Sequence, residues 1–427
     1  MSGLGSVALI GPVPPELGGQ TSGGVATHQA HLAAGLVRHG VQACLLATNA
    51  TEAPSAPRAH PVGVLRRAAP IPMLRMRPLR VRDRDYLRRV GLVPLARYAL
   101  HLARAGAGRS SRRDLLGHLL WYRVFLCDVR PSLIHVQHPL ERCSNVREVL
   151  RLERLRLPLV VTAHSLFGEH PESAIYGQMA PNLRAAERII AVSPHVADQA
   201  VALGVHPDRV RVIRSGVDTA TFAPRDRRQA RQALSLTADA PLVLFVGNLE
   251  PRKQLDVLLR AVAELRSRAP EVELAIVGSG ASAGADDQTE RLRQLSRELD
   301  LRGAVHFAGA VDAETLLRWY AAADVFALPS SSEAQGIVAL EAMACGLPVV
   351  ASAVGGLLGT LEDGQTGYLV PPGDVPALTE RILALLTEPA RRARLGQAAR
   401  RKVERDFSWE ATVVSTIEVY REVLACG

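Results

Sequence analysis

Short apolar runs recur along the whole chain and alternate with segments that place Leu and Ala at helical spacing. The runs are nearly continuous in Val, Ile, Leu and Ala, which is typical of parallel strands covered on both faces. They predict strands at residues 6–11, 41–48, 132–138, 158–164, 188–193, 209–216, 241–247, 272–278, 304–309, 324–329 and 347–352. Helices are expected between them, for example at Asp256–Arg268, Asp287–Leu299 and Ala313–Ala322. This alternation predicts an α/β protein built on doubly wound parallel sheets.

The strand–helix pattern pauses once and then starts again, which indicates two Rossmann-like domains. We expect the first domain to span residues 1–222 and the second 223–408. The last helix, at 409–427, is long enough to pack back across the junction toward the first domain. An Arg-rich insertion at about 58–130 interrupts the first domain, and a loop rich in Pro and Ala is expected at 51–71. The rest of the insertion favours helix.

The formal net charge of +9 over 427 residues is unevenly distributed. Residues 1–220 hold 28 Lys+Arg against 15 Asp+Glu, a net +13, and the remainder has a net −4. Arg58–Arg130 alone contains 17 arginines and four acidic residues, so it accounts for the excess. Two interpretations stay open: a solvated helical insertion, or a basic surface that contacts an anionic membrane or an anionic, lipid-linked acceptor. Nucleic acid is not an expected partner, because no recognisable reading motif accompanies the charge.

Cysteine usage and the N-terminus bear on where the protein resides. The five cysteines are scattered and form no Cys-x-x-Cys pair, so neither a disulfide framework nor a zinc knuckle is indicated. The N-terminal MSGLGSVALIG has no basic region, and no apolar run approaches the roughly 18–20 residues that span a bilayer. We therefore expect a cytoplasmic protein, with at most peripheral contact with the inner face of the cell membrane.

Ligands in open α/β sheets bind outside the carboxyl ends of the strands, so the loops after strands are the places to look for a site. The loop and helix after the strand at 324–329 place Glu333 and Glu341 eight positions apart. Between them, Gly336 and Ile337 would begin a helix, and the first N–H groups of a helix bind anions. This element predicts an anion cradle with a carboxylate on either side. Such a cradle suits the phosphates and hydroxyls of a sugar nucleotide.

Three other patterns point to chemistry that we do not favour. His135 and His138 suggest a metal pair, but residues i and i+3 of a strand face opposite sides, which favours structural roles. The glycines Gly278, Gly280 and Gly284 do not fit the GxGxxG fingerprint, which argues against a nicotinamide site. No serine elbow supports a hydrolase. No convincing acidic metal cluster appears either, and we expect no metal ion or other cofactor.

Glu333, seven further residues, Glu341 and then AMACGLPVVAS form a pattern that resembles the signature of the family-4 retaining glycosyltransferases (glycosyl transferases group 1), which have the GT-B fold. Further segments resemble the family in the same order: SGGVATHQAHLAAGLVRHG, TAHS, AVSPHVADQAVALGV, SGVDTATF, VGNLEPRKQLDVLLRA, IVGSG, AVGG and DGQTGYLVPPGD. The resemblance runs over most of the chain, and it implies that the two domains face a cleft that holds the active site. Residues 75–123 have no counterpart in it.

The resemblance implies a donor-binding role for several residues of the second domain. Glu333 would hold the hydroxyls of the donor sugar and steady the reacting centre, and Glu341 would hydrogen-bond the ribose. Lys253 would neutralise the pyrophosphate with Arg252 beside it. The backbone N–H groups at 336 and 337 would bind the phosphates.

Three residues of the first domain also take roles from the resemblance. Gly23 and Gly24 would let the backbone approach the donor phosphate and the acceptor. His164, at the end of a strand, would contact the donor sugar. Together with Glu333 and Lys253, His164 completes the expected catalytic set.

The sequence departs from the family pattern at three positions. Asn248 stands where the family usually has an arginine, and Arg252 is a candidate to compensate for it. Gly359 stands where an acidic residue is expected, and Gln335 where an aromatic residue is common. We expect the last two changes to alter the lining of the donor end of the site.

These patterns together predict an enzyme that moves a hexose-type sugar from a UDP- or GDP-sugar to an acceptor hydroxyl with retention of configuration. Cell-envelope, polysaccharide or glycolipid synthesis is the expected setting, and the acceptor is the unknown partner. The main alternative is a non-catalytic GT-B protein or scaffold that binds a sugar nucleotide. A nucleotide-sugar epimerase is less favoured, because the Glu333 and Glu341 pattern points to transferases.

Overall fold

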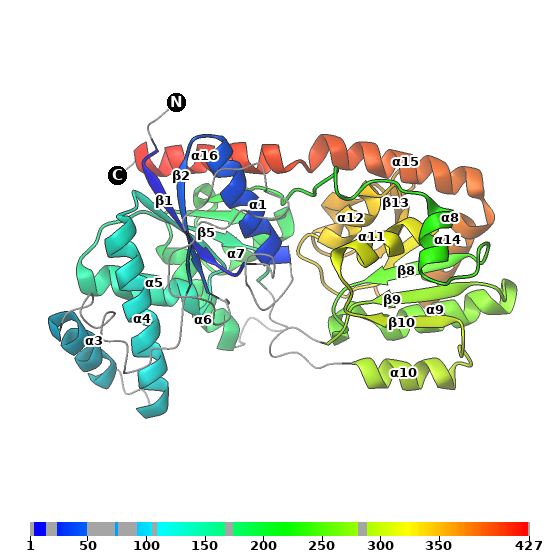
Figure 1. Ribbon diagram of the computed structural model, residues 1–427, viewed down its shortest axis with the longest axis horizontal. Coiled ribbons are helices and arrows are strands. Elements are labelled where there is room, and N and C mark those ends of the chain that lie inside the picture. Colours follow the sequence, from blue (N-terminus) through cyan, green and yellow to red (C-terminus); the bar gives the residue numbers. More distant parts are fainter. Residues whose placement is uncertain are drawn as a thin grey trace. The chain divides into compact units, whose positions relative to one another are not determined.

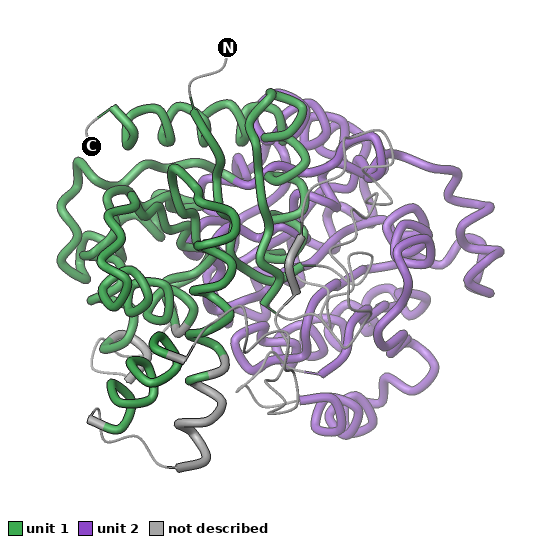
Figure 2. Tube along the Cα trace, turned by 60° about the vertical axis from the view of Figure 1, so that its left-hand side comes forward, with its two compact units in different colours: residues 1–214, 409–427 green, residues 215–408 purple. Residues whose placement is uncertain are grey.

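The structure is a computed structural model that describes residues 4–13, 24–48, 73–75, 92–104, 109–166, 174–280 and 288–425. The chain forms two compact units (Figure 2). Unit 1 comprises residues 1–214 and 409–427, and unit 2 comprises residues 215–408. Each unit contains one parallel sheet with helices between its strands (Figure 1), so the predicted α/β class is confirmed. The described residues contain no helix with both the length and the apolarity that a membrane crossing requires.

Unit 1 is built on a seven-stranded sheet in the order β3-β2-β1-β4-β5-β6-β7. Its strands are β1 (Ser6–Gly11), β2 (Gln42–Ala47), β3 (Met73–Arg75), β4 (Leu133–Gln137), β5 (Leu159–Ala163), β6 (Arg188–Ala191) and β7 (Val210–Val212). Its helices are α1 (Gly24–Arg38), α3 (Leu92–Arg104), α4 (Arg109–Val129), α5 (Glu141–Glu153), α6 (Ala174–Ala185), α7 (Pro194–Ala202) and α16 (Trp409–Ala425). The strand order reverses between β1 and β4, which is the switch point where doubly wound sheets bind ligands.

Unit 2 repeats this design with a six-stranded sheet in the order β10-β9-β8-β11-β12-β13. Its strands are β8 (Leu242–Val246), β9 (Glu273–Val277), β10 (Val305–Gly309), β11 (Val325–Leu328), β12 (Val349–Ser352) and β13 (Gly367–Val370). Its helices are α8 (Arg227–Ala233), α9 (Leu255–Arg268), α10 (Thr289–Glu298), α11 (Ala313–Ala322), α12 (Ile337–Ala344), α13 (Leu357–Thr360), α14 (Val375–Thr387) and α15 (Pro389–Asp406). Here the switch point lies between β8 and β11.

Side-chain caps explain where several helices of unit 2 begin. Asp226, Asp312 and Asp374 each accept a hydrogen bond from the backbone N–H three residues later, at 2.9, 2.7 and 2.9 Å. Such caps satisfy N–H groups that the helix itself cannot bond. Several strands next to these helices are fully buried, for example all residues of β8 and of β11. Continuous burial explains why these strands were readable as apolar runs.

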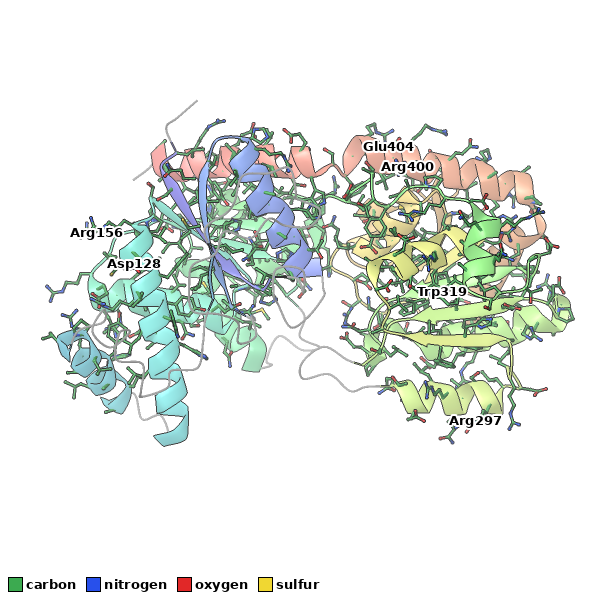
Figure 3. The ribbon with its side chains drawn as sticks, viewed as in Figure 1. Asp128, Arg156, Arg297, Trp319, Arg400 and Glu404 are labelled. Atoms are coloured by element: carbon green, nitrogen blue, oxygen red, sulfur yellow. The ribbon has the colours of Figure 1, made fainter. Side chains whose placement is uncertain are left out.

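The structure divides into units at 214/215, before the domain boundary predicted at 222/223. Residues after 214 are held by unit 2, because Val217 donates a backbone hydrogen bond to the carbonyl oxygen of Phe407 at 3.0 Å. Arg400 on α15 (Figure 3) also donates to the backbone oxygens of Thr219 and Phe222, at 3.0 and 2.7 Å. These contacts are long-range, so no local sequence pattern marked them.

The last helix, α16, belongs to unit 1, as expected for a helix that returns from the second domain. It packs against α1, and both contribute to the hydrophobic core of unit 1 through residues such as Val413 and Ile417. The two helices approach closely at Gly35, where an added Cβ would lie 2.2 Å from Cγ2 of Val413. A glycine is therefore needed at this position for α1 and α16 to pack.

Two short edge strands were not predicted. β3 has three residues within the Arg-rich insertion, and β13 has four residues between the turn at Gly364 and Pro371. Residues typical of turns enclose both strands, Pro72 and Pro78 around β3 and Gly364 and Pro371 around β13, and such residues favour a loop. The described helices α3 and α4 agree with the helical tendency predicted for residues 75–123, whereas the loop expected at 51–71 lies outside the described residues.

Candidate active site

The switch point of unit 2 is formed by the loops that follow β8 and β11. The loop after β8 ends in a short 3₁₀ turn, Pro251–Lys253, and the loop after β11 carries Ser330 and Glu333. The two loops are joined by their backbones, because Ser331 donates its N–H to the carbonyl oxygen of Arg252 at 2.8 Å. Chemically active side chains from both loops can therefore meet at the carboxyl end of the sheet.

Lys253 and Glu333 form an ion pair at this point, through Nζ and Oε1. Both residues are buried, with 6% and 7% of their surface exposed. Ser330 donates its hydroxyl to the same carboxylate oxygen at 3.0 Å. A buried charge is costly unless it is paired and hydrogen-bonded, and each of these charges is. The structure thus unites two residues that the sequence predicted as catalytic.

A second acidic residue, Glu250, organises the loop after β8. Its carboxylate accepts from Nε of Arg252 at 2.7 Å and from Nδ2 of Asn248 at 3.3 Å. Nη1 of Arg252 lies 3.9 Å from Oε1 of Glu333, so Arg252 contacts both carboxylates. Glu250 was not identified from the sequence, although it stands only two positions before Arg252. Asn248, the departure from the family pattern, takes part in this network.

The loop after β11 runs directly into α12. Gly336 caps that helix with a left-handed φ of 78°, and Ala339 is the first residue whose N–H bonds back to Gly336, at 2.9 Å. The N–H groups of Gly336 and Ile337 precede this first helical hydrogen bond, as an anion cradle requires. The predicted cradle and Glu333 therefore adjoin each other in the chain and in the fold.

Glu341, further along α12, is held by a tyrosine of the neighbouring helix α11. The hydroxyl of Tyr320 donates to Oε2 of Glu341 at 2.8 Å. Burial raises the pKa of Glu341 to about 7, and the Tyr320 hydrogen bond opposes that rise. This carboxyl group therefore titrates near neutral pH. Tyr320 carries no motif that could have identified it.

Gln335 has a different role from the one expected. We predicted that it alters the lining of the donor end, but its side-chain amide is occupied by the backbone of Ser215. Nε2 donates to the Ser215 oxygen at 2.8 Å, and Oε1 accepts from the Ser215 N–H at 3.0 Å. Gln335 thereby fixes the first residue of unit 2 to the loop that carries Glu333.

The glycine pair before α13 supports the same loop. Gly356 donates its N–H to the carbonyl oxygen of Glu333 at 2.8 Å. A Cβ on Gly356 would lie 2.0 Å from the carbonyl oxygen of Ala334, so only glycine permits this approach. Gly359 lies within α13. The segment thus acts through its backbone at Glu333.

Unit 1 contains the remaining predicted residues. His164 follows β5, and its Nε2 is 2.8 Å from Oε1 of Gln137 at the end of β4. Gly24 is the first residue of α1, whereas Gly23 lies outside the described residues. His164 and Gly24 thus belong to one unit, and Lys253 and Glu333 to the other.

Several histidines gather around this end of unit 1. His135 on β4 is completely buried, and its two ring nitrogens are each 2.6 Å from the hydroxyls of Tyr420 and Thr162. Burial lowers the pKa of His28 and of His135 to about 3, that of His138 to about 4, and that of His164 below its ordinary value. All four are therefore neutral at pH 7.

The metal pair considered for His135 and His138 gains no third ligand from the residues that the structure describes. Both nitrogens of His135 already have hydroxyl partners. Among the described residues, no group of three or more His, Cys, Asp or Glu side chains is arranged to hold a metal ion. His135 serves the packing of β4, β5 and α16.

The two units match two family models. Residues 22–221 match the model of glycosyltransferase family 4, and residues 226–402 match that of glycosyl transferases group 1. The chain belongs to the family-4 glycosyltransferases, a family of transferases (EC 2.4) with the GT-B fold.

The chain is similar to proteins named D-inositol 3-phosphate glycosyltransferase. It is 39% identical over 287 residues to one from Catenulispora acidiphila, covering 64% of this chain and 66% of that relative. It is 36% identical over 307 residues to one from Kribbella flavida, covering 68% of this chain and 72% of that relative. The matched part thus spans about two thirds of the length of these relatives.

Solved structures extend the likeness to the whole chain. Sucrose-phosphate synthase from Thermosynechococcus elongatus has a TM-score of 0.77 and 26% identity, covering 99% of this chain and 100% of that chain. Anabaena HepE in complex with UDP and glucose has a TM-score of 0.73 and 20% identity, covering 97% and 99%. The GT-B fold expected from the sequence is confirmed.

Proposed function

We propose that the chain is a retaining glycosyltransferase that moves a hexose-type sugar from a UDP- or GDP-sugar to an acceptor hydroxyl. One observation carries this proposal. At the switch point of unit 2, the buried Lys253–Glu333 pair and Arg252 adjoin the N-terminus of α12. Positive charge, helix N–H groups and a carboxylate are the groups that a diphosphate and its attached sugar require.

The departing nucleoside diphosphate gains negative charge as the bond to the sugar breaks. Lys253, Arg252 and the N–H groups at the start of α12 would stabilise that charge, and such preorganised groups are often the largest contribution to catalysis. We propose that they do so without a metal ion or other cofactor. Glu333 would accept hydrogen bonds from the sugar hydroxyls.

Retention of configuration follows when the acceptor attacks the face of the sugar from which the diphosphate departs. In the proposed step the bond between the anomeric carbon and the leaving phosphate oxygen breaks, and the acceptor oxygen bonds to that carbon on the same face. The leaving phosphate oxygen takes the acceptor proton. His164 would contact the donor sugar from unit 1. This step is the one implied by the family resemblance.

The comparisons suggest which compounds to test first. Anabaena HepE is described in complex with UDP-glucose, which supports UDP-sugars as first donors, with GDP-sugars beside them. The relatives named D-inositol 3-phosphate glycosyltransferase support a phosphorylated polyol as the first acceptor. A lipid-linked acceptor of the cell envelope is the next class to test.

The decisive experiment measures release of nucleoside diphosphate by the full chain, with and without acceptor. UDP-, GDP- and ADP-sugars are first ranked by thermal shift, because a bound ligand raises apparent stability. Acceptor-dependent release that persists in EDTA supports the proposal. Tight sugar-nucleotide binding without release from any acceptor favours the scaffold alternative, and activity that EDTA abolishes contradicts the metal-free step.

We also propose that the Arg-rich insertion contacts an anionic membrane surface. The described helix α3 supports this, because Val93 and Leu100 are 71% and 53% exposed on it, in a segment rich in arginine. Co-sedimentation with vesicles of neutral or anionic lipid tests the idea, with Val93→Ser/Leu100→Ser as the variant. Binding to anionic vesicles only, weakened in the variant, is expected. Equal binding to both vesicles, or to neither, contradicts it.

A further inference from the structure

His164 is held on one side by a hydrogen bond. Its Nε2 donates to Oε1 of Gln137 at 2.8 Å, while the amide nitrogen of Gln137 faces Nε2 of His135 at 3.5 Å. This bond places the proton of the neutral imidazole on Nε2. One hydrogen bond fixes a single atom of the ring, however, and leaves the ring free to tilt about that contact.

A second ring, that of His28 on α1, restrains this tilt of His164. The centroids of His28 and His164 are 4.6 Å apart, and their planes are at 80°. This is the edge-to-face arrangement that aromatic pairs prefer. His28 is only 2% exposed, so it has little room to move away. His164 is therefore located by Gln137 at one atom and by His28 across the ring.

His28 is itself packed against the first residue of α16. The ring centroids of His28 and Trp409 are 5.3 Å apart at 68°, and Trp409 stacks on His31 at 4.6 Å and 8°. His28 and His31 both lie on α1, so Trp409 contacts two side chains of that helix. His28 thus lies between the ring of His164 and the indole of Trp409.

We propose that His28 is a positioning residue for His164, and that Trp409 holds His28 in place. The inference rests on the proposed function only in assigning His164 to the donor sugar. Trp409 directly follows Ser408, the last residue of unit 2, so the stack begins where the chain passes back into unit 1. The C-terminal helix is therefore part of the machinery that orients His164.

Four variants of the full chain separate positioning from simple stability. His28→Ala removes the ring, His28→Phe restores a ring without imidazole nitrogens, and Trp409→Ala removes the support. The matched control is His39→Ala, which removes another contact to α16, the 2.7 Å pair with Glu410, at an exposed place. Transfer kinetics and UDP affinity are measured for each, with ¹⁵N spectra of the histidine side chains.

We expect His28→Ala to lower kcat about 10- to 100-fold, since small misplacements of reacting groups have effects of this size. Trp409→Ala should act in the same direction and more weakly, and His28→Phe should recover most of kcat. UDP affinity should stay unchanged throughout, because the phosphates are assigned to unit 2. The His164 imidazole signals should shift in His28→Ala and Trp409→Ala but not in His39→Ala.

Three results overturn the proposal: wild-type kcat in folded His28→Ala, equal impairment of His28→Phe and His28→Ala, or unchanged His164 signals in His28→Ala. If His28→Ala does not fold, Trp409→Phe, which keeps a smaller ring, is measured in the same way. Unchanged His164 signals in Trp409→Phe then overturn the proposal. If the wild-type chain transfers no sugar, the proposed function fails, while the imidazole spectra still decide whether His28 positions His164.

Discussion

The two units share one sheet design but differ in whether they bury charged side chains. Excess positive charge is concentrated in residues 1–220, at +13 against −4 for the rest. Among the residues that the structure describes, however, the buried Asp, Glu, Lys and Arg side chains all lie in unit 2. They are Arg231, Glu250, Lys253, Asp324, Glu333 and Lys402. Unit 1 instead buries amides, hydroxyls and imidazoles, such as Gln29, Gln137, Thr162, His28 and His135.

This difference shows that the net charge of a sequence segment does not predict whether charged side chains are buried in the corresponding unit. An arginine can enter a core only with a partner, and unit 2 provides one for Arg231, whose guanidinium is 2.9 Å from Asp324. In the insertion, Arg123 is also paired, with its Nε 3.0 Å from Oε1 of Glu153, but both of these side chains keep some exposure, at 16% and 13%. Unit 2 therefore holds charge where a diphosphate is expected, and unit 1 surrounds His164 with neutral groups.

Acid should destabilise unit 1 and not unit 2, and this is the largest effect we expect. His28, His135 and His138 have folded pKa values of about 3, 3 and 4, against roughly 6.5 in an unfolded chain. The unfolded state therefore binds protons first. These histidines make their full contribution to the free energy of unfolding above pH 6.5, and that contribution is lost as the pH falls. At pH 5 the loss is about 2 kcal/mol for each histidine. His31 beside His28, and Arg142 beside His138, act in the same direction.

Glu341 should make the stability of unit 2 depend on pH in the opposite direction. Its folded pKa of about 7 exceeds the ordinary 4.5, so the folded state gains a proton first and unit 2 gains stability as the pH falls from 7 to 4.5. Urea unfolding at pH 7.5 and 5 measures both units. A variant without Trp319 (Figure 3) keeps Trp121 and Trp409, which report on unit 1, and a variant with Trp319 as its sole tryptophan reports on unit 2. Equal losses in the free energy of unfolding of the two units between pH 7.5 and 5 would contradict this difference between them.

Separating the Lys253–Glu333 pair should give the next largest effect. Lys253→Met and Glu333→Leu each leave one buried charge without its partner, at a cost of about 3 kcal/mol in the free energy of unfolding. The double variant should regain most of that stability. Sugar transfer should stay at least about 100-fold below wild type in all three, because preorganised charge is absent.

Lys402→Met is the matched control for this experiment. Lys402 is the only other lysine of the chain, and it pairs with Glu362 at 2.6 Å, also in unit 2. Loss of stability with activity retained is expected. If the double Lys253→Met/Glu333→Leu variant transferred sugar at the wild-type rate, the pair would be purely structural.

A smaller effect is expected from Tyr320→Phe. In the wild-type chain the hydrogen bond from Tyr320 lowers the pKa of Glu341. Its loss in the variant should therefore raise that pKa from its value of about 7. Nucleoside diphosphate affinity should fall about fivefold at pH 7.5, in line with one hydrogen bond. Calorimetry across pH 6 to 9 measures both changes. Tyr368→Phe, on β13, is the control, and an identical response from both variants would remove Glu341 from the donor site.

The smallest effect should come from an exposed pair of unit 1. Glu410→Ala removes the carboxylate that lies 2.7 Å from Nε2 of His39, and Glu410 is 60% exposed. Exposed ion pairs add little, so urea unfolding should show a change below about 0.5 kcal/mol. A loss as large as that of the Lys253 variants would show that unit 1 also depends on ion pairs.

Much of the fold was readable in advance, because buried parallel strands appear as continuous apolar runs. Strand β1 was predicted with its observed bounds, and β8 and β11 to within one residue at either end. The edge strands β3 and β13 were not predicted, because prolines and glycines enclose their apolar residues and favour a loop. The division of the units at 214/215 could not be predicted, because Gln335 secures Ser215 from 120 positions away.

The sequence by itself determined the fold class, the family resemblance and the candidate residues for a sugar-nucleotide site. These are local properties: strand and helix periods, and motifs that hold Lys253, Glu333 and Glu341. Only the tertiary structure decided which charges are buried together and which rings contact His164. Lys253 and Glu333 are 80 positions apart, and Trp409 reaches α1 only because α16 returns to unit 1. Contacts of this kind depend on how the strands order themselves in a sheet, and a local pattern carries no record of that order.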